Sequence, residues 1–108
     1  LIADKDAFIS VSGATKKDYF ERKISTELEN VMNDRKPVII TEDSKTIPLH
    51  SDEENGEYSS QVIAPIIAEG DAIGAVLIVS KNSGEKFNEL ELKLSETAAA
   101  FLGKQMEQ

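Results

Sequence analysis

The first hydrophobic positions of the chain follow the pattern of a short β-hairpin. Residues 1–3 and 8–11 are apolar runs of strand length, and the polar segment 4–6 between them consists of turn-forming residues. Gly13 ends the second run. The pattern therefore predicts two short antiparallel strands joined by a tight turn.

A helical period follows this hairpin. Thr15 and Asp18 have the spacing of a capping box at a helix start. Ser25 and Thr26 prefer helix caps to helix interiors, so they can divide the stretch into two short helices. Four apolar residues recur at intervals of four, four and three positions, which places them on one helix face: Phe20, Ile24, Leu28 and Val31.

The helical pattern ends at Pro37, which cannot continue a helix. The β-branched run at residues 38–41 then predicts a short strand. Residues 42–57 are mostly polar and show no period, so we expect the longest and most mobile loop of the chain there.

Two strand-length runs, residues 59–67 and 72–80, form the strongest hairpin pattern in the chain. Gly70 lies in the turn between them and supplies the positive φ that a tight turn requires. Because both faces of the second strand are apolar, we expect it at the centre of a sheet, with Gly74 allowing another backbone or a helix to approach. Simple alternation puts Ile73, Ala75, Leu77 and Val79 on one face and Ala72, Gly74, Val76 and Ile78 on the other.

The last twenty residues have the pattern of a long amphipathic helix. Its apolar stripe is wider than one contact needs, so we expect it to face both the domain's own sheet and a second copy of the chain. The predicted self-association surface consists of Phe87, Leu90, Leu94, Ala98, Phe101 and Leu102, with Thr97 on the same stripe.

Composition narrows the function classes. The 108 residues are enough for one domain with a single core, and the net charge of −8 repels the phosphate backbone of nucleic acids. The chain has no cysteine, which excludes disulfides, thiolate nucleophiles and zinc-thiolate sites. Its apolar runs are far shorter than the roughly 20 residues that span a bilayer. No basic segment precedes an apolar stretch either, so we expect a soluble, unexported chain. Because no methionine precedes Leu1, we also expect it to be a segment of a larger protein.

Several segments resemble the GAF domain family. Residues 60–67, the turn Glu69-Gly70-Asp71 and the Ile-Gly-x-Val-Leu strand within residues 73–79 are similar to the central hairpin of GAF domains. Residues 1–13, 16–19 and 96–108 resemble more closely the regulatory half of AbrB-like sporulation transcription regulators. The resemblance covers nearly the whole chain and is absent from residues 42–57.

This resemblance implies an α/β (α+β) fold, a GAF-like antiparallel sheet with helices on its faces and a C-terminal amphipathic helix. It also implies one regulatory domain over residues 1–108, a DNA-binding domain upstream of residue 1, and a homodimer or tetramer in the cytoplasm of a spore-forming bacterium or its developing spore. DNA would be contacted only through the upstream domain. The signature of cyclic-nucleotide-binding members is missing, as is the cysteine that bilin attachment needs.

The position of ligand pockets in GAF domains suggests a small-molecule site walled by Phe8, Ser10, Ile39, Ile47 and Gln61. Each apolar member is also a natural core residue. Gln61 is the polar exception: an amide near a sheet face needs a partner if it is buried, and we favour an exposed amide. These residues do not indicate which effector such a pocket would hold.

Candidates for other chemistry are weak. His50 is the only histidine, and adjacent residues such as Ser51 and Asp52 cannot converge on it as a catalytic relay, so we expect an exposed loop histidine. The acidic residues 52–57 lack the spacing of a calcium loop. We therefore expect no catalytic residue, no metal and no cofactor. Two functions remain open: a small-molecule-sensing regulatory domain that oligomerises, and a ligand-free oligomerisation scaffold.

Overall fold

The computed structural model describes residues 1–10, 22–41, 46–51, 58–81 and 87–106. Within these residues the chain forms one five-stranded antiparallel sheet and two helices. The strands are β1 (Ile2–Asp4), β2 (Phe8–Ser10), β3 (Val38–Thr41), β4 (Ser60–Ala68) and β5 (Asp71–Ser80), and the helices are α2 (Thr26–Asn33) and α3 (Glu89–Met106). Neither described helix is long and apolar enough to cross a membrane.

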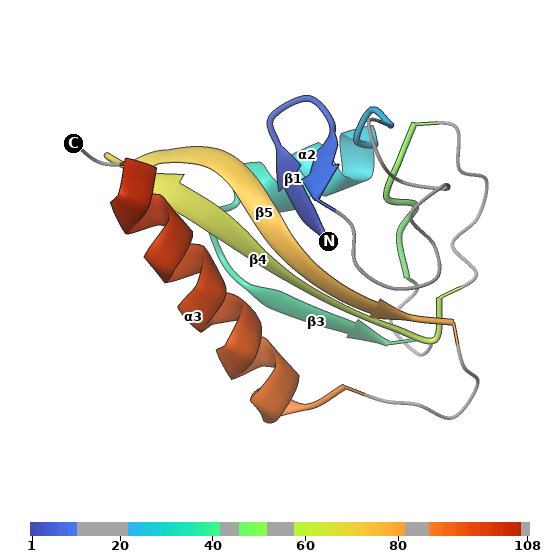
Figure 1. The fold of residues 1–108 in the computed structure, drawn as a ribbon. Helices are drawn as coiled ribbons and strands as arrows, with labels where there is room; N and C mark the ends of the chain where they lie inside the picture. Colours follow the sequence, from blue (N-terminus) through green and yellow to red (C-terminus); the bar gives the residue numbers. More distant parts are fainter. Residues whose placement is uncertain (11–21, 42–45, 52–57, 82–86, 107–108) are drawn as a thin grey trace.

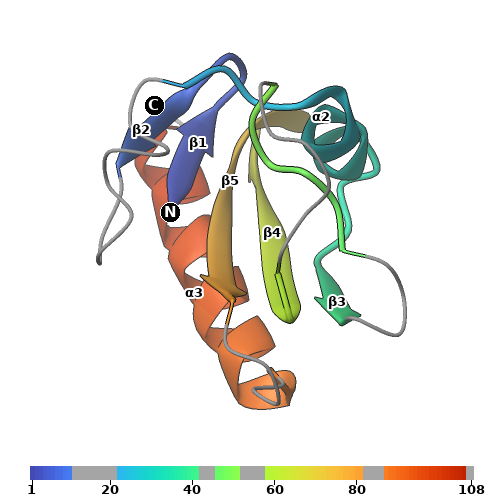
Figure 2. The ribbon, with the colours of Figure 1, turned by 90° about the vertical axis from the view of Figure 1, so that its right-hand side faces the viewer.

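The sheet is covered by one helix on each face. Its strand order is β2-β1-β5-β4-β3, so β5 is the middle strand, as its two apolar faces predict. The long helix α3 lies along β4 and β5 on one side, and α2 contacts the same strands from the other side (Figures 1 and 2). This arrangement confirms the predicted α+β fold.

The first hairpin forms where the sequence predicts it. Asp4 organises the turn, because its Oδ1 atom accepts hydrogen bonds from the backbone N–H groups of Asp6 (2.7 Å) and Ala7 (2.9 Å). β1 then pairs with β5, and the Leu77 N–H donates to the Leu1 carbonyl (2.8 Å). The hairpin is thereby attached to the central strand.

The turn between β4 and β5 needs positive φ at two residues. Glu69 has φ 52° and Gly70 has φ 85°, the combination of a type I′ turn, whose twist matches that of the strands it joins. The sequence predicted this role for Gly70 but not for Glu69. The strands begin and end within one residue of the predicted bounds.

An irregularity at the start of β5 changes which side chains share a face. Ile66 pairs with Gly74 and Ile67 pairs with Ala72, so Ile73 is an extra residue between two pairs. The face assignment from simple alternation is therefore wrong for Ala72 and Ile73. Ala72 packs against the core under α2, and Ile73 packs against the core under α3.

The two faces carry cores of different character. The core on the α2 side is large and includes fully buried Phe8, Leu28 and Leu49. The core on the α3 side is built from smaller residues, among them Ala64 and Ala99. Most of the apolar stabilisation by large side chains therefore lies under α2.

Helix α2 is shorter than the predicted helical stretch. Residues 11–21 lie outside the described residues, and Ile24 is not in a helix. Ser25 is the N-cap, and its Oγ atom accepts from the Leu28 N–H at 3.0 Å, which confirms the predicted break at this position. At the other end the helix stops at Asn33, four residues before Pro37, and Arg35 turns the chain away with φ 60°.

A reciprocal cap begins α3. Asn88 Oδ1 accepts from the Leu90 N–H (2.9 Å), and the Asn88 N–H donates to Glu91 Oε1 (3.1 Å). The helix consequently starts at Glu89, and Phe87 precedes it. Near the other end, a Cβ atom on Gly103 would collide with the Ile67 carbonyl oxygen, so this glycine lets α3 lie close against β4.

We predict that Gly74→Ala destabilises the domain by about 2–3 kcal/mol, because the new methyl group would collide with the Ala3 carbonyl of β1. Urea denaturation measures the change. Gly70→Ala is the control, since nothing lies within 4 Å of its Cβ position and only the cost of φ +85°, about 1 kcal/mol, applies. Equal losses at both positions would contradict the contact with β1.

A second prediction concerns the α-amino group of a chain that starts at Leu1. Its nitrogen donates to the Leu77 carbonyl at 3.0 Å, and burial lowers its pKa below the ordinary 8.0 because desolvation disfavours the charged form. The unfolded chain then binds more protons, so stability rises with pH between the folded pKa and 8.0 and is lower below that window. Urea denaturation across this range should show the rise, and an N-acetylated chain should lack it.

Candidate functional site

Three of the five predicted pocket residues lie together on the α2 side of the sheet. Phe8 is 0% exposed and belongs to the core there, and Ile47 packs against the same core. Gln61 is also 0% exposed, on β4. These side chains lie between the sheet and residues 46–51. This segment passes over the α2 side of the sheet and is called the crossing segment below.

The Gln61 amide clamps the crossing segment to β4 through two hydrogen bonds to the backbone of Ile47. Its Nε2 atom donates to the Ile47 carbonyl (2.7 Å), and its Oε1 atom accepts from the Ile47 N–H (3.0 Å). The expectation of an exposed amide is therefore wrong. A buried amide needs hydrogen-bond partners, and the backbone of Ile47 supplies them. A buried strand residue thus holds the crossing segment in register.

One of the two other predicted pocket residues, Ile39, is not brought to this cluster. Ile39 lies between Val38 and Ile40, which both pack against the α2-side core, so alternation puts Ile39 on the opposite face of the sheet. The side chain of Ser10 lies outside the described residues. A ligand cavity lined by Phe8, Ile47 and Gln61 stays a prediction.

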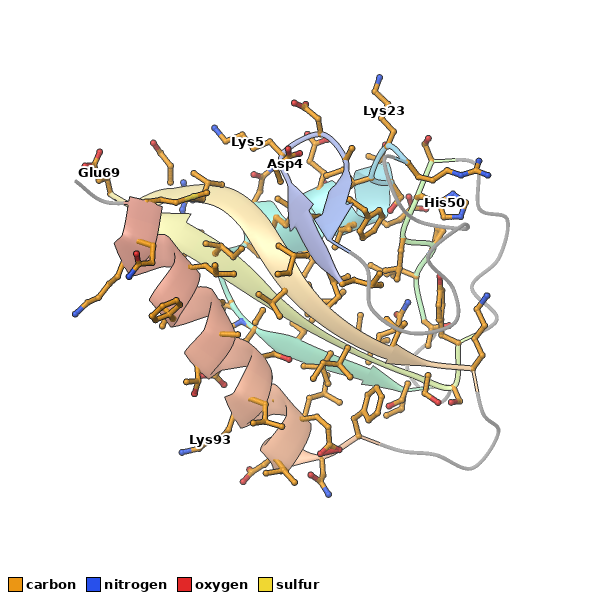
Figure 3. The ribbon with its side chains drawn as sticks, viewed as in Figure 1. Asp4, Lys5, Lys23, His50, Glu69 and Lys93 are labelled. Atoms are coloured by element: carbon orange, nitrogen blue, oxygen red, sulfur yellow. The ribbon has the colours of Figure 1, made fainter. Side chains whose placement is uncertain are left out.

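His50 belongs to the same crossing segment. It is half-buried, its Nδ1 atom is shielded from solvent, and its backbone forms a bridge with Ile24, so the expectation of an exposed histidine is wrong (Figure 3). Neighbouring backbone bonds join Ser25 N–H to the Leu49 carbonyl (2.8 Å) and Ser51 N–H to the Lys23 carbonyl (2.9 Å). These bonds attach residues 49–51 to residues 23–25. The acidic residues 52–57 lie outside the described residues.

The Ser25 hydroxyl connects this segment to α2. It caps the helix and also donates to the Pro48 carbonyl at 2.6 Å. Together with Gln61, it fixes the described part of the predicted mobile loop to the helix on one side and to the sheet on the other. The N-cap preference of serine predicted the role of Ser25 in α2. The contact of Ser25 with Pro48 could not be predicted, because only the fold brings these two residues together.

The predicted self-association residues divide into three groups on α3. Leu90, Leu94 and Phe101 point to solvent and are 65%, 57% and 62% exposed. Ala98 and Leu102 are half-buried and pack against the α3-side core. Phe87 is half-buried ahead of the helix, and its N–H donates to Ser60 Oγ at 3.1 Å.

The face of α3 that rests on the sheet consists of small residues. Ser95, Ala99 and Gly103 recur every four positions and are buried. The large apolar stripe was expected to make the sheet contact, and this row of small residues was not predicted. Its signal was present in the regular spacing of small side chains, which allow a helix to approach a sheet closely.

A groove of about 360 Å³ runs beside this contact, between α3 and β4. Its lining is mainly apolar and includes Pro37, Pro65 and Ala100, with the charged side chains Glu96 and Lys104 on the helix. The pairing of β3 with β4 ends at Val38 and Ile63, so the groove begins where β4 loses its outer neighbour.

The described chain is an α+β domain in which an antiparallel sheet carries a helix on each face. A family model described as "Stage V sporulation protein T C-terminal, transcription factor" matches residues 1–107. Stage V sporulation protein T of Bacillus subtilis (strain 168) is 46% identical over 110 aligned residues. The chain belongs to the family of the C-terminal domain of stage V sporulation protein T.

The alignment covers 100% of the chain and 58% of the length of that relative. The relationship is to a sporulation transcription factor, and it supports a regulatory role. This confirms the expected connection with sporulation and transcription.

We predict that Gln61→Leu destabilises the domain by about 2 kcal/mol, because the Ile47 N–H and carbonyl lose their partner while they stay partly buried. Urea denaturation measures the loss, and the amide of Ile47 should exchange its hydrogen faster. Ile47→Val keeps both hydrogen bonds and should cost about 1 kcal/mol without faster exchange. Unchanged exchange at residue 47 in the leucine variant would contradict the clamp.

Proposed function

We propose that this chain is the regulatory domain of a sporulation transcription factor, of the GAF type, which self-associates through α3. In this proposal it positions DNA-binding domains upstream of residue 1, of the AbrB-like kind, and a small-molecule effector changes their arrangement. The family relationship supports the regulatory role.

The exposed apolar row on α3 carries the proposal. Leu90, Leu94 and Phe101 are each more than half exposed, whereas the buried residues of α3 are Ser95, Ala99 and Gly103. A row of large apolar side chains in water is unfavourable, and such a patch usually marks an interaction surface. Burial of the row against a partner would remove that cost.

The spacing of the row fits a second copy of the same helix. Leu90, Leu94, Thr97 and Phe101 follow one another at intervals of four, three and four positions, the pattern by which two helices pack along a shared seam. Thr97 is exposed with the others. Two copies related by a twofold axis would present the same row to each other, which suits a symmetric dimer or tetramer.

The charge of the chain argues that DNA is bound elsewhere in the full protein. A net charge of −8 raises the cost of approaching phosphate groups at long range. The acidic domain therefore suits the regulatory half, and the upstream part suits the DNA-binding half. Coupling between an effector site and such a partner domain typically amounts to about 1–3 kcal/mol.

A ligand-free scaffold is the alternative function, and one observation favours it. Phe8 and Gln61, which were expected to wall a pocket, are fully buried, and the Gln61 amide already bonds to Ile47. Thermal unfolding with a panel of metabolites separates the two functions. An effector at 100 times its Kd adds about 2.7 kcal/mol to stability, whereas a scaffold shows no shift with any compound.

We predict that the chain is at least a dimer and that Leu94→Glu combined with Phe101→Glu makes it monomeric, because charged groups would then face each other across the seam. Analytical ultracentrifugation measures the molecular mass. The two substituted side chains are exposed, so circular dichroism should show an intact fold.

Asn30→Glu, on the exposed part of α2, is the matched control for added charge and should leave the oligomer intact. If the double variant still sediments as the parent oligomer, α3 is not the interface.

A further inference from the structure

A second hollow, here called the α2 hollow, lies on the opposite side of the sheet from α3. Its volume is about 300 Å³, at the small end of the range for ligand pockets. Three separate segments form it: the β1–β2 turn with Lys5, α2 and the residues after it, and the start of β5 with Asp71 and Ala72 (Figure 3 shows Lys5 at this turn).

The lining of the α2 hollow carries charges of both signs in equal number. Lys5 and Arg35 are cations, and Glu29 and Asp71 are carboxylates. In the stretches of chain that the structure describes, no ion pair joins these four side chains to one another. Each charge is therefore available to a ligand. Met32, which is 2% exposed, and Ala72 add an apolar part to the lining.

Arg35 is held in place before any ligand arrives. Its backbone takes the uncommon φ of 60°, and its N–H donates to the Met32 carbonyl at 3.0 Å. The guanidinium donates from Nε to the Gly70 carbonyl (3.0 Å) and from Nη1 to the Asn33 carbonyl (3.4 Å). Both acceptors are neutral, and three of the five guanidinium N–H groups stay available. A fixed cation loses little entropy when it binds an anion.

We infer that the α2 hollow binds a small zwitterion, an α-amino acid with a short aliphatic side chain. Its carboxylate would lie at Arg35 and Lys5, its ammonium group at Glu29 and Asp71, and its side chain against Met32 and Ala72. A guanidinium and a carboxylate form strong, charge-assisted hydrogen bonds. The balanced lining, in a chain of net charge −8, disfavours polyanions such as nucleotides.

Occupation of the α2 hollow would add one shared contact to three parts of the chain, of which the end of α2 and the β4–β5 turn are already joined by the bond from Arg35 to Gly70. The β1–β2 turn, the end of α2 and the β4–β5 turn would share one ligand, and the binding energy would oppose their separation. The regulatory meaning of this ligand rests on the proposed function, in which it would be the effector. Binding itself does not depend on α3, which lies on the other face of the sheet.

The test is NMR titration of the ¹⁵N-labelled chain with three probes: L-alanine, N-acetyl-L-alanine and L-alaninamide. The second probe lacks the positive charge and the third lacks the negative charge. We expect L-alanine to shift the amide signals of Lys5, Arg35 and Ala72, and each single-charge probe to bind at least about tenfold more weakly.

Two variants test the role of the guanidinium. Arg35→Gly removes it at a position where glycine accepts the positive φ, so the fold should be kept and L-alanine binding should fall about tenfold or more. Lys36→Gln removes the same charge one residue away, outside the hollow, and should leave binding unchanged.

The inference is overturned if L-alanine shifts no signal at tens of millimolar, if its shifts map away from the hollow, if N-acetyl-L-alanine binds equally well, or if Lys36→Gln weakens binding as much as Arg35→Gly. The same titration in the Leu94→Glu, Phe101→Glu variant tests whether ligand binding depends on the proposed self-association. Binding that persists there supports the hollow whatever the oligomeric state.

Discussion

The pairing of β4 with β5 is the interaction on which the other contacts of this domain depend. β5 also binds β1, and β4 also binds β3, so the two strands hold the edges of the sheet together. Both helices pack on this pair from opposite sides. The pair is long and antiparallel, and its turn has a twist that suits the strands, which lets it form from residues close in sequence. The two cores are then added to its two faces.

The contact between α3 and this pair decides what the helix can offer to other molecules. The contact through Ser95, Ala99 and Gly103 covers only a narrow strip of the helix surface, because these side chains are small. Leu90, Leu94 and Phe101 are thereby left on the solvent side, while Leu102 packs against the α3-side core. A helix that rested on the sheet through leucines would have had no such row to present. Close packing inside the domain and the exposed row outside it are consequences of the same choice of residues.

Sequence patterns could predict the fold because the decisive features are local. The turn residues around Gly70, the double apolar faces of residues 72–80 and the serine cap at position 25 each act over a few positions. The extra residue Ile73 was not predictable in this way, because it depends on the partner strand. The same holds for the candidate sites. Gln61 binds a backbone fourteen positions away, and the charges of the α2 hollow come from three segments that only the folded chain brings together.

The bulge at Ile73 also limits how the domain can change in length. In a regular ladder, losing one residue reverses the orientation of every side chain beyond the deletion. Here the ladder already contains one extra residue, Ile73, which packs under α3, while Ala72 before it and Ala75 after it both pack against the core under α2. A deletion of Ile73 would restore regular pairing and leave Ala72 on its present face, but it would remove the contacts of Ile73 with the core under α3. A length change elsewhere in this ladder would reverse the side chains beyond it, so insertions and deletions should be confined to position 73 and to segments that no ladder constrains.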